Sequence, residues 1–284
     1  PLERSVCVKV MHPHVATDAQ LVKRFHREAR AASSLQHQTI VSVMDFGQAD
    51  VTSGREAGER VLYLVMEYID GKDLADILFA EGPLDPLRLT RLMREVCFAL
   101  DEAHAQGVVH RDLKPENIMV YRTRLGDERA KVLDFGIAKI LDDGQAEITR
   151  LTMAGTVCGT PEYMSPEQAR GKDLDGRSDL YALGVIIYQL LTGQLPFDGK
   201  TPIEIVTKHL TSPPVAPSRL RSDIPPALET LVLRLLEKKQ ESRPRSAMDV
   251  AHELERIDRA LGNVEDLRSS TDPQRTALQV IPPE

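Results

Sequence analysis

Eight consecutive residues, His110 to Asn117, concentrate the side chains of this sequence that could do chemistry; they read His-Arg-Asp-Leu-Lys-Pro-Glu-Asn. Asp112 can accept or orient the proton of an incoming hydroxyl, and Lys114 can neutralise a negatively charged group beside it. Asn117 offers an amide oxygen to a hard cation, and Asp134, seventeen residues further on, offers a carboxylate to the same ion. Asp and Asn often only close turns, but this ordered set suits phosphoryl transfer, which needs positioning and charge neutralisation.

The elements around this run place it in a loop between a helix and a strand. Apolar side chains at three- and four-residue spacing predict a helix with one buried face that ends at Gly107; its apolar positions are Leu89, Leu92, Met93, Val96, Leu100 and Ala103. Asp134 follows the short apolar run Lys131-Val132-Leu133 and begins the sequence Asp-Phe-Gly. In order and spacing, these motifs resemble the catalytic loop and the metal-binding turn of the eukaryotic-type protein kinases.

The resemblance extends over nearly the whole chain and implies an α+β, bilobal protein-kinase-like fold. Residues 1–68 are expected to form a partial N-lobe, an incomplete antiparallel sheet with one helix. Residues 69–262 are expected to form a large, mainly helical C-lobe with the catalytic loop and the activation segment. Apolar periodicity fades past Gly262, so residues 263–284 are predicted to be a mobile tail or linker.

In the N-lobe, the resemblance assigns ATP binding to Lys9, which stands in an alternating strand pattern. Asp18 predicts the start of a helix that carries Glu28. The family places a glutamate there, and its ion pair with the lysine holds the ammonium toward the phosphates. Arg27 and Arg30 leave a plainer alternative, in which Glu28 belongs to a solvated helix face and pairs locally.

Between the lobes, the resemblance implies an adenine-binding connector. Backbone groups of Glu67 and Ile69 would hydrogen-bond the adenine, and Met66 would gate the pocket behind it. Asp73 would reach the ribose, and Met119 would form the floor beneath the base. A strand followed by an ordinary turn would fit the same residues without ATP.

The sequence departs from the family pattern near its start. Only eight residues precede Lys9, too few for the glycine-rich loop that covers the phosphates and for the strands that flank it. Gly54 and Gly58 do not replace that loop, because they lie in a polar connection between two predicted strands. We therefore expect the chain to be a fragment of a longer kinase, truncated before the glycine-rich loop.

Residues 136–167 resemble an activation segment, rich in Thr and poor in bulky apolar side chains. Thr149, Thr152 and Thr156 are candidate phosphorylation sites. A phosphate adds a charge of about −1.5 to −2 and would pair with a cation such as Arg111, so phosphorylation is expected to order the segment and raise activity. An ordinary Thr-rich surface loop is the alternative.

The segment from Gly159 to Glu167 resembles the substrate-docking loop of the same family, and its sequence is similar to that of eukaryotic-like kinases of bacteria. The resemblance also identifies Lys114 as a mark of serine/threonine kinases. Thr160, a further candidate regulatory position, would contact Asp112 and Lys114 and would act more through structure than through regulation.

Three residues are expected to support the loops. By resemblance, Glu167 would form a buried ion pair with Arg243, far along the chain. Asp179 would bind the backbone of the catalytic loop, although an Asp at this place could also cap the long apolar helix that follows it. Breaking one side of a buried ion pair is costly, because the other charge is left alone.

Composition bounds the remaining possibilities. The chain has 284 residues and a net charge of −7, with 42% hydrophobic and 28% charged residues, so we expect a globular protein with no nucleic-acid surface. Three cysteines without paired spacing indicate a reducing compartment and no disulfide framework. No apolar run reaches membrane-spanning length, which favours a cytoplasmic chain; the parent protein could be anchored through other segments.

The resemblance thus implies a serine/threonine protein kinase of signal transduction. It would use ATP with Mg²⁺ or Mn²⁺, act on protein substrates and dimerise for trans-autophosphorylation. The first rival is a kinase-shaped scaffold that cannot bind nucleotide because the glycine-rich loop is missing. The second is a small-molecule kinase, which the peptide-docking motif at residues 159–167 disfavours.

Overall fold

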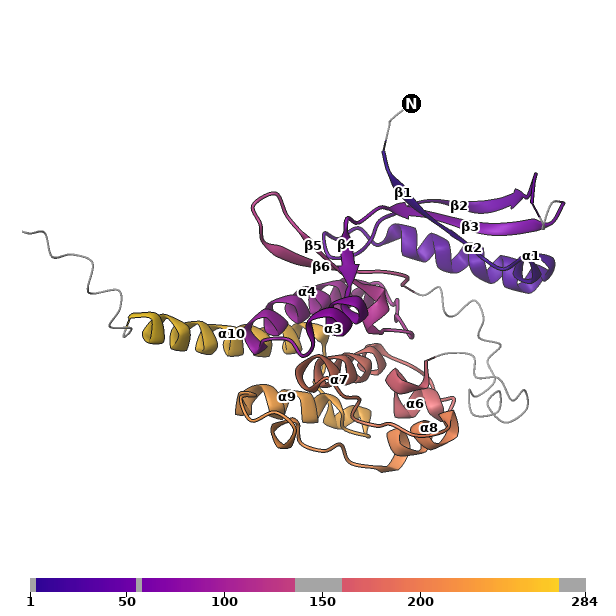
Figure 1. Cartoon of the computed structure of the whole chain (residues 1–284). Coiled ribbons are helices and arrows are strands. Elements are labelled where there is room, and N and C mark those ends of the chain that lie inside the picture. Colours follow the sequence, from indigo (N-terminus) through magenta and orange to yellow (C-terminus); the bar gives the residue numbers. More distant parts are fainter. Residues whose placement is uncertain (1–3, 55–57, 136–159, 271–284) are drawn as a thin grey trace, which may run out of the picture.

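The computed structural model describes residues 4–54, 58–135 and 160–270 of the chain. These residues form a small lobe built on a sheet and a large lobe built mainly of helices (Figure 1). The expected α+β, bilobal fold is therefore confirmed. Among the helices of the described ranges, none is both long enough and apolar enough to cross a membrane.

The small lobe is an antiparallel sheet in the order β1-β3-β2, with two helices packed beside it. Its elements are β1 (Val6–Val10), α1 (Pro13–Thr17), α2 (Ala19–Ser34), β2 (Val43–Asp50) and β3 (Arg60–Glu67). Successive strand residues point to opposite faces, so Leu62 and Leu64 of β3 share one face of the sheet. Both are fully buried in one core with Phe25 of α2, which holds the helix against the sheet.

Helix α2 begins where the sequence predicts. The side chain of Asp18 accepts hydrogen bonds from the backbone N–H groups of Gln20 (2.7 Å) and Leu21 (3.3 Å), which would otherwise lack partners in the first turn. The short helix α1 was not predicted, because five residues are too few to show a periodic pattern.

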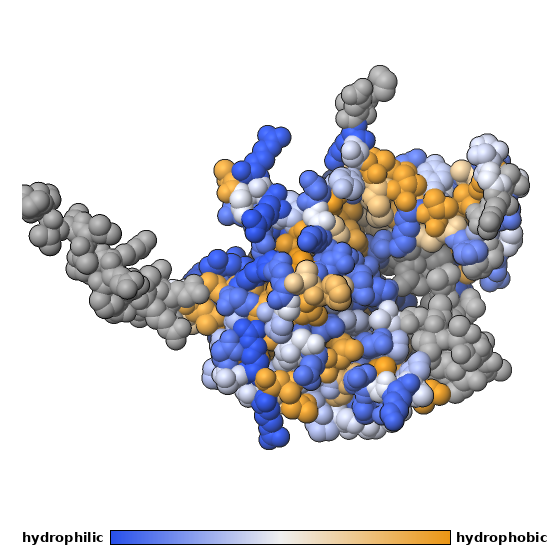
Figure 2. Space-filling model, viewed as in Figure 1, coloured by the Kyte–Doolittle hydropathy of each residue, from blue (hydrophilic) through white to orange (hydrophobic). Residues whose placement is uncertain are grey.

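Strand β1 lies at the edge of the described sheet and carries Lys9 opposite Leu64 of β3. On its other face, Val6, Val8 and Val10 are 42%, 53% and 58% exposed. Figure 2 shows hydrophobic residues gathered over this part of the small lobe. The sequence alternation therefore predicts the strand correctly, but its apolar row is not a buried one in the described part of the chain.

A second antiparallel sheet, β4-β5-β6, joins the lobes. Its strands are β4 (Gly71–Asp73), β5 (Ile118–Arg122) and β6 (Glu128–Val132). The strand expected after the run His110 to Asn117 is β5, and the β5–β6 hairpin pairs as far as Arg122 and Glu128. The register sets Asp73 opposite Met119, which brings two residues of the predicted adenine site together.

Gly71 allows this close approach. A Cβ atom there would lie 2.3 Å from the carbonyl oxygen of Val120, so we expect Gly71→Ala to push β4 off β5 and to lower the free energy of unfolding by about 1–3 kcal/mol. Urea unfolding measures the change. Gly262→Ala is the matched control, because nothing lies within 4 Å of its added Cβ, and it should be neutral or slightly stabilising.

The large lobe packs its helices around a central apolar one. Its helices are α3 (Leu74–Glu81), α4 (Pro86–Ala105), α6 (Pro166–Ala169), α7 (Gly176–Thr192), α8 (Pro202–Thr211), α9 (Pro226–Leu235) and α10 (Ala247–Ser270), with short 3-10 helices η1 (Pro115–Asn117), η3 (Pro161–Tyr163), η4 (Pro217–Arg219) and η5 (Gln240–Ser242). Every residue of α7 from Ser178 to Tyr188 is buried, as its continuous apolar pattern predicts.

Two helices extend beyond what the sequence analysis describes. Helix α7 starts at Gly176, ahead of Asp179, because the side chain of Asp175 accepts the backbone N–H of Arg177 (2.8 Å) and caps the helix there. Helix α10 continues past Gly262 to Ser270, so residues 263–270 of the predicted tail are helical. The short helix α3 was not predicted.

Candidate active site

A buried carboxylate binds the backbone at the start of the run from His110 to Asn117. Asp179 of α7 accepts hydrogen bonds from the backbone N–H groups of His110 (2.8 Å) and Arg111 (2.9 Å). These bonds support Arg111 at φ 70°, a conformation that costs a non-glycine residue free energy. The expected contact between Asp179 and the loop backbone is present, whereas the alternative of a helix cap is wrong, because Asp175 fills that position.

His104 of α4 completes the support. Its Nε2 lies 2.7 Å from Asp179, whose side chain is 1% exposed. Burial acts to raise the pKa of Asp179, but the hydrogen bond and charge of His104 outweigh it, so the net shift is downward. The carboxylate therefore stays ionised and keeps accepting both backbone bonds. Sequence reasoning missed His104, since nothing local connects it to a residue so much later in the chain.

Asp112 and Lys114 point into the same space. The Lys114 ammonium lies 3.0 Å from the Asp112 carboxylate and 3.2 Å from the hydroxyl of Thr160. The expected contact of Thr160 with Lys114 is therefore present. The side chain of Asp112 is 34% exposed, so the carboxylate can be reached from solvent. A carboxylate and an ammonium placed in this way can orient a hydroxyl and neutralise a transferred anionic group.

Asn117 is hydrogen-bonded to the backbone of the same loop. Its side-chain amide nitrogen donates to the backbone oxygen of Asp112 (2.8 Å), so this hydrogen bond does not use the amide oxygen. Leu133 donates its backbone N–H to the backbone oxygen of Asn117 (2.8 Å). This bond brings the backbone of Asp134, the next residue, close to that of Asn117; that their side chains share one cation stays a prediction.

Asp134 fits a cation ligand. Its backbone has φ 60°, and in the described ranges it shares a positive φ with only one other non-glycine residue, Arg111, in the same site. One carboxylate oxygen lies 2.6 Å from the ammonium of Lys9, while the other is buried and accepts no hydrogen bond from the described part of the chain. A buried oxygen without a partner is costly unless a ligand uses it.

Asp134 and Asn117 would supply the protein oxygens of a magnesium or manganese site. No group of three or more His, Cys, Asp and Glu side chains comes together in the part of the chain that the structure describes.

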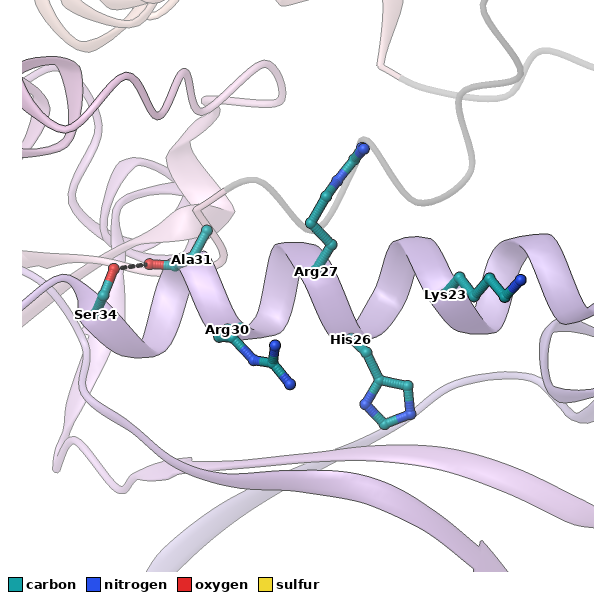
Figure 3. A pocket seen from close by; sticks show the side chains of 6 residues that line it. All are labelled: Lys23, His26, Arg27, Arg30, Ala31 and Ser34. Carbon is teal, nitrogen blue, oxygen red and sulfur yellow. Dashed lines mark hydrogen bonds between the residues drawn. The ribbon is translucent and has the colours of Figure 1, made fainter.

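Lys9 pairs with a different carboxylate from the one expected. Its ammonium contacts Asp134, and no ion pair joins it to Glu28 within the described residues. Glu28 instead accepts from the Nε (3.0 Å) and Nη2 (2.9 Å) atoms of Arg27, its neighbour in sequence. The local pairing of Glu28 that the sequence left open is present, but the solvated helix face that went with it is not, because Glu28 is buried. Arg27 itself extends away from α2 (Figure 3), and its side chain is 65% exposed.

The connector residues also form hydrogen bonds that stabilise the fold. The side chain of Glu67 accepts from Lys131 (2.7 Å) and from the backbone N–H of Ser42 (2.8 Å). Burial acts to raise the pKa of Glu67, but these bonds lower it overall. Asp73 caps α3 by accepting the backbone N–H of Asp76 (2.8 Å). Its carboxylate therefore has a structural role whether or not it also meets a ribose.

The pocket expected behind Met66 is nearly filled. A cavity of about 10 Å³ remains there; its lining is Ala32, Ile40, Val41, Val43, Met66, Asp134 and Phe135. Phe135 is buried and meets His110 edge to face, with ring centroids 4.9 Å apart. Ile69, the other connector residue, packs against the small-lobe core.

The buried pair of Glu167 and Arg243 is present. The two Nη atoms of Arg243 donate to the two carboxylate oxygens at 2.7 and 2.8 Å, and Ser178 donates to the same carboxylate at 2.7 Å. Burial acts to raise the pKa of Glu167, but Arg243 and Ser178 lower it overall. The pair links the end of residues 160–167 to the segment between η5 and α10.

Gln168 links that end to the candidate catalytic loop. Its side-chain nitrogen donates to the backbone oxygen of Arg111 (2.6 Å), while its side-chain oxygen accepts the backbone N–H of Ser165 (2.9 Å). Ser165 in turn accepts the backbone N–H of Gln168 (3.3 Å), forming a capping box. We missed Gln168, although a Ser followed three residues later by a Gln is a readable signal.

Thr149, Thr152 and Thr156 lie outside the described residues. Their proposed partner Arg111 is described: in those ranges its guanidinium takes part in no ion pair or side-chain hydrogen bond. The expectation that Arg111 can receive an anion therefore stays a prediction.

A buried histidine of α8 packs against Tyr181 and Phe197. His209 is fully buried, its Nδ1 lies 2.9 Å from the hydroxyl of Tyr181, and its ring meets Phe197 at 4.8 Å. Burial, with the nearby charge of Lys238, lowers the pKa of His209 to about 3. The folded protein therefore keeps this ring neutral in mildly acidic solution.

This burial predicts an acid-sensitive stability. Because the pKa is lower in the folded chain, the unfolded chain binds more protons below about pH 6.5, and stability falls toward pH 3. We expect His209→Asn to be less stable at pH 7 but to lose about 1.4 kcal/mol less per pH unit between pH 6 and 4. Urea unfolding across that range measures both; equal slopes for the two proteins would contradict the prediction.

Comparison with known proteins agrees with this geometry. A family model described as "Protein kinase domain" matches residues 2–254. The serine/threonine-protein kinase pkn3 of Myxococcus xanthus is 50% identical over 281 residues, which is 97% of this chain and 48% of that protein. The serine/threonine-protein kinase PknB of Mycolicibacterium smegmatis is 39% identical over 283 residues, 99% of this chain and 43% of that protein.

A solved structure extends the likeness to three dimensions. The PknI kinase domain of Mycobacterium tuberculosis superimposes with a TM-score of 0.66 at 28% identity, covering 88% of this chain and 85% of that one. The chain spans about half the length of the curated relatives it matches. The family match over most of the chain, together with the site geometry, shows that the chain belongs to the protein kinase domain family.

Proposed function

We propose that this chain is the catalytic domain of a serine/threonine protein kinase that transfers the γ-phosphoryl group of ATP, with Mg²⁺ or Mn²⁺, to hydroxyl groups of proteins. One observation carries the proposal. The Lys9 ammonium of the small lobe lies 2.6 Å from the Asp134 carboxylate. Asp134 follows Leu133, whose backbone N–H donates to the backbone oxygen of Asn117. These contacts support the proposal that phosphate-binding and cation-binding groups from both lobes meet near Asp112.

Each of these groups has a task in phosphoryl transfer. Asp112 orients the incoming hydroxyl and accepts its proton, and Lys114 neutralises the charge on the transferred group. Asn117 and Asp134 hold the cation, which supplies charge neutralisation to the phosphates. Lys9 binds the phosphates. Thr160, which contacts Lys114 at 3.2 Å, sets the distance between the docking loop and the acid.

The adenine would bind at the connector. Backbone groups of Glu67 and Ile69 meet the edge of the base, Met119 lies beneath it, and Asp73 reaches the ribose. Support comes from the register, which sets Asp73 opposite Met119. Because Asp73 also caps α3, its loss would cost stability as well as nucleotide affinity.

The ion pairs support a regulated enzyme. Lys9 can serve the phosphates only when it leaves Asp134, and a move of α2 that offers Glu28 would favour this exchange. Phosphorylation at Thr149, Thr152 or Thr156 would give Arg111 an anionic partner and favour the active arrangement. Trans-autophosphorylation within a dimer would couple the enzyme to an upstream signal, and we place this activity in the cytoplasm.

Nucleotide binding tests the proposal. We expect ATP with Mg²⁺ to raise the melting temperature of this chain, or of a version extended ahead of Pro1, and Lys9→Met to remove most of that shift without unfolding the protein. Lys72→Met, an exposed lysine of β4, is the control and should keep the shift. Absence of any shift in both versions would favour the scaffold over the kinase.

A further inference from the structure

A buried chain of hydrogen bonds in the large lobe takes no part in the chemistry proposed above. The hydroxyl of Tyr181, in α7, lies 2.9 Å from Nδ1 of His209, in α8. The same hydroxyl accepts a hydrogen bond from the ammonium of Lys238, just past the end of α9, at 3.3 Å. Tyr181 and His209 are fully buried, whereas Lys238 is partly exposed. We name Lys238, Tyr181 and His209 the Lys238 relay.

Lys238 sets the direction of these hydrogen bonds. An ammonium has three donors and no acceptor, so the oxygen of Tyr181 accepts from it. The hydroxyl proton of Tyr181 is then left for Nδ1 of His209. Burial raises the pKa of Tyr181 and the charge of Glu167 adds to the rise, against the opposing charge of Arg243, so the hydroxyl keeps its proton in neutral and mildly alkaline solution.

The direction of the bonds fixes the tautomer of His209. Because its pKa is lowered to about 3, by burial and by the charge of Lys238, the ring carries a single proton at neutral pH. Nδ1 accepts from Tyr181, so that proton lies on Nε2. Nε2 is buried and has no hydrogen-bond partner in the described ranges. A buried donor in this situation is costly unless an acceptor lies close by.

The acceptor for this proton belongs to η3. Helix α8 packs against η3, and the backbone of Glu162 acts to raise the pKa of His209. A backbone group has this effect on an imidazole when its carbonyl oxygen accepts a ring proton, whereas a backbone N–H would have the opposite effect. The contact is looser than a regular hydrogen bond, which agrees with the missing partner of Nε2.

Aromatic and charged neighbours surround the Lys238 ammonium. It lies 3.9 Å from the ring centroid of Phe197 and 5.6 Å from that of Tyr181, and ring faces attract cations. Burial and the charge of Arg243 lower the pKa of Lys238 to about 8, while Glu237 acts to raise it. The ammonium therefore predominates at pH 7 and is lost in mildly alkaline solution.

We propose that Lys238 is a positioning residue for η3: as an ammonium it keeps the proton of His209 on Nε2, and that proton holds the backbone of η3 at Glu162. Helix η3 directly follows Thr160, whose hydroxyl accepts from Lys114 at 3.2 Å. The consequence for substrate docking rests on the proposed function, because residues 159–167 are the expected docking loop. The tautomer and the hold on η3 do not depend on it.

¹⁵N NMR of the whole chain measures the tautomer without ATP. Ring nitrogens with and without a proton differ in chemical shift, and the signals of His209 are those that His209→Asn removes. At pH 7 we expect the proton on Nε2 in the parent and a substantial population with the proton on Nδ1 in Lys238→Met. Lys238→Arg should keep the parent tautomer, because a guanidinium is also a donor only. Lys239→Met, at the exposed neighbouring lysine, is the matched control and should behave as the parent.

The pH dependence gives a second readout of the tautomer. A neutral amine can accept as well as donate, so Lys238 no longer dictates the direction of the bonds once it loses its proton. In the parent, the form with the proton on Nδ1 should appear as the pH rises through about 8. In Lys238→Arg it should stay absent up to pH 9, because a guanidinium does not titrate there.

Hydrogen exchange measures the hold on η3. The backbone N–H groups of Tyr163 and Met164 donate to the backbone oxygens of Thr160 and Pro161, both at 3.3 Å. Both amides should exchange roughly two- to tenfold faster in Lys238→Met, the change expected from one lost hydrogen bond. Tyr181→Phe, which removes the hydroxyl in the middle of the relay and no charge, should give the same result. Amides of the β5–β6 hairpin are the internal reference and should keep their rates.

Three results would overturn the proposal. The first is a proton on Nδ1 of His209 in the parent at pH 7. The second is a tautomer that Lys238→Met leaves unchanged. The third is exchange at η3 that is unchanged, or that accelerates no more than the β5–β6 hairpin, which would mean a general loosening of the fold.

Kinetics then tests the link to substrate docking. In a version of the chain that transfers phosphate, Lys238→Met should raise KM for a peptide substrate roughly two- to tenfold and leave KM for ATP unchanged, and Lys238→Arg should restore the parent value. An unchanged KM for the peptide would overturn this link. If no version transfers phosphate, the proposed function fails, while the NMR and exchange results still decide whether the Lys238 relay holds η3.

Discussion

Asp112→Asn is expected to lower phosphoryl transfer by roughly 10²- to 10⁴-fold and to leave the fold unchanged. The carboxylate is the group placed to take the proton of the incoming hydroxyl, 3.0 Å from the Lys114 ammonium that faces the same anion. The bond from Asn117 reaches the backbone oxygen of Asp112, which the substitution keeps. Because the side chain is 34% exposed, no buried partner is left unsatisfied.

The measurement is steady-state transfer to a protein substrate, in the version of the chain that binds ATP. The fall should appear in kcat, with little change in KM for ATP, because Asp112 faces the hydroxyl and not the nucleotide. Asp127→Asn makes the same change at an exposed hairpin position and should keep full activity. Turnover of Asp112→Asn within twofold of the parent would remove Asp112 from its proposed role.

Arg243→Met is expected to lower the free energy of unfolding by about 3–5 kcal/mol. Arg243 is completely buried, and it donates not only to Glu167 but also to the backbone oxygens of Arg177 (2.9 Å) and Glu237 (2.8 Å). Its loss leaves the Glu167 carboxylate buried without its cationic partner. It also removes the hydrogen bonds to the backbone of Arg177 and of Glu237. For a domain of this size, the melting temperature should fall by roughly 6–20 °C.

The pH dependence distinguishes a stranded charge from lost packing. In the parent, the lowered pKa of Glu167 stabilises the fold above the ordinary glutamate value, and that stabilisation is lost as the pH falls through the folded pKa. Without Arg243, burial alone raises the pKa of Glu167, so the variant gains stability on protonation. The difference in free energy of unfolding between the parent and Arg243→Met should therefore narrow from pH 7 to pH 4.5.

Urea unfolding at both pH values, with the double variant Glu167→Met and Arg243→Met, completes the test. The double variant should be less destabilised than the sum of the single ones, because neither charge is left alone. Arg219→Met, at an exposed arginine, is the control and should change stability little. A pH-independent difference would show that Arg243 acts by packing alone.

The sequence by itself determined the parts of the site that are local. Asp112, Lys114 and Asn117 lie within six residues, so one loop brings them together whatever the rest of the chain does. The buried face of α4, the continuous apolar pattern of α7 and the Asp18 cap of α2 could also be predicted, since each depends on spacing within one element. The pairing of Glu167 with Arg243 came from the family resemblance, because no local rule joins residues so far apart.

Only the tertiary structure decided which partner each charge takes. Lys9 could meet Glu28 or Asp134, and the choice depends on where α2 and the two lobes lie, which no spacing in the sequence records. The same holds for His104, which binds Asp179, and for the buried oxygen of Asp134. Alternative ion pairs of similar strength differ by little free energy, so the packing of whole elements, rather than the residues themselves, selects among them.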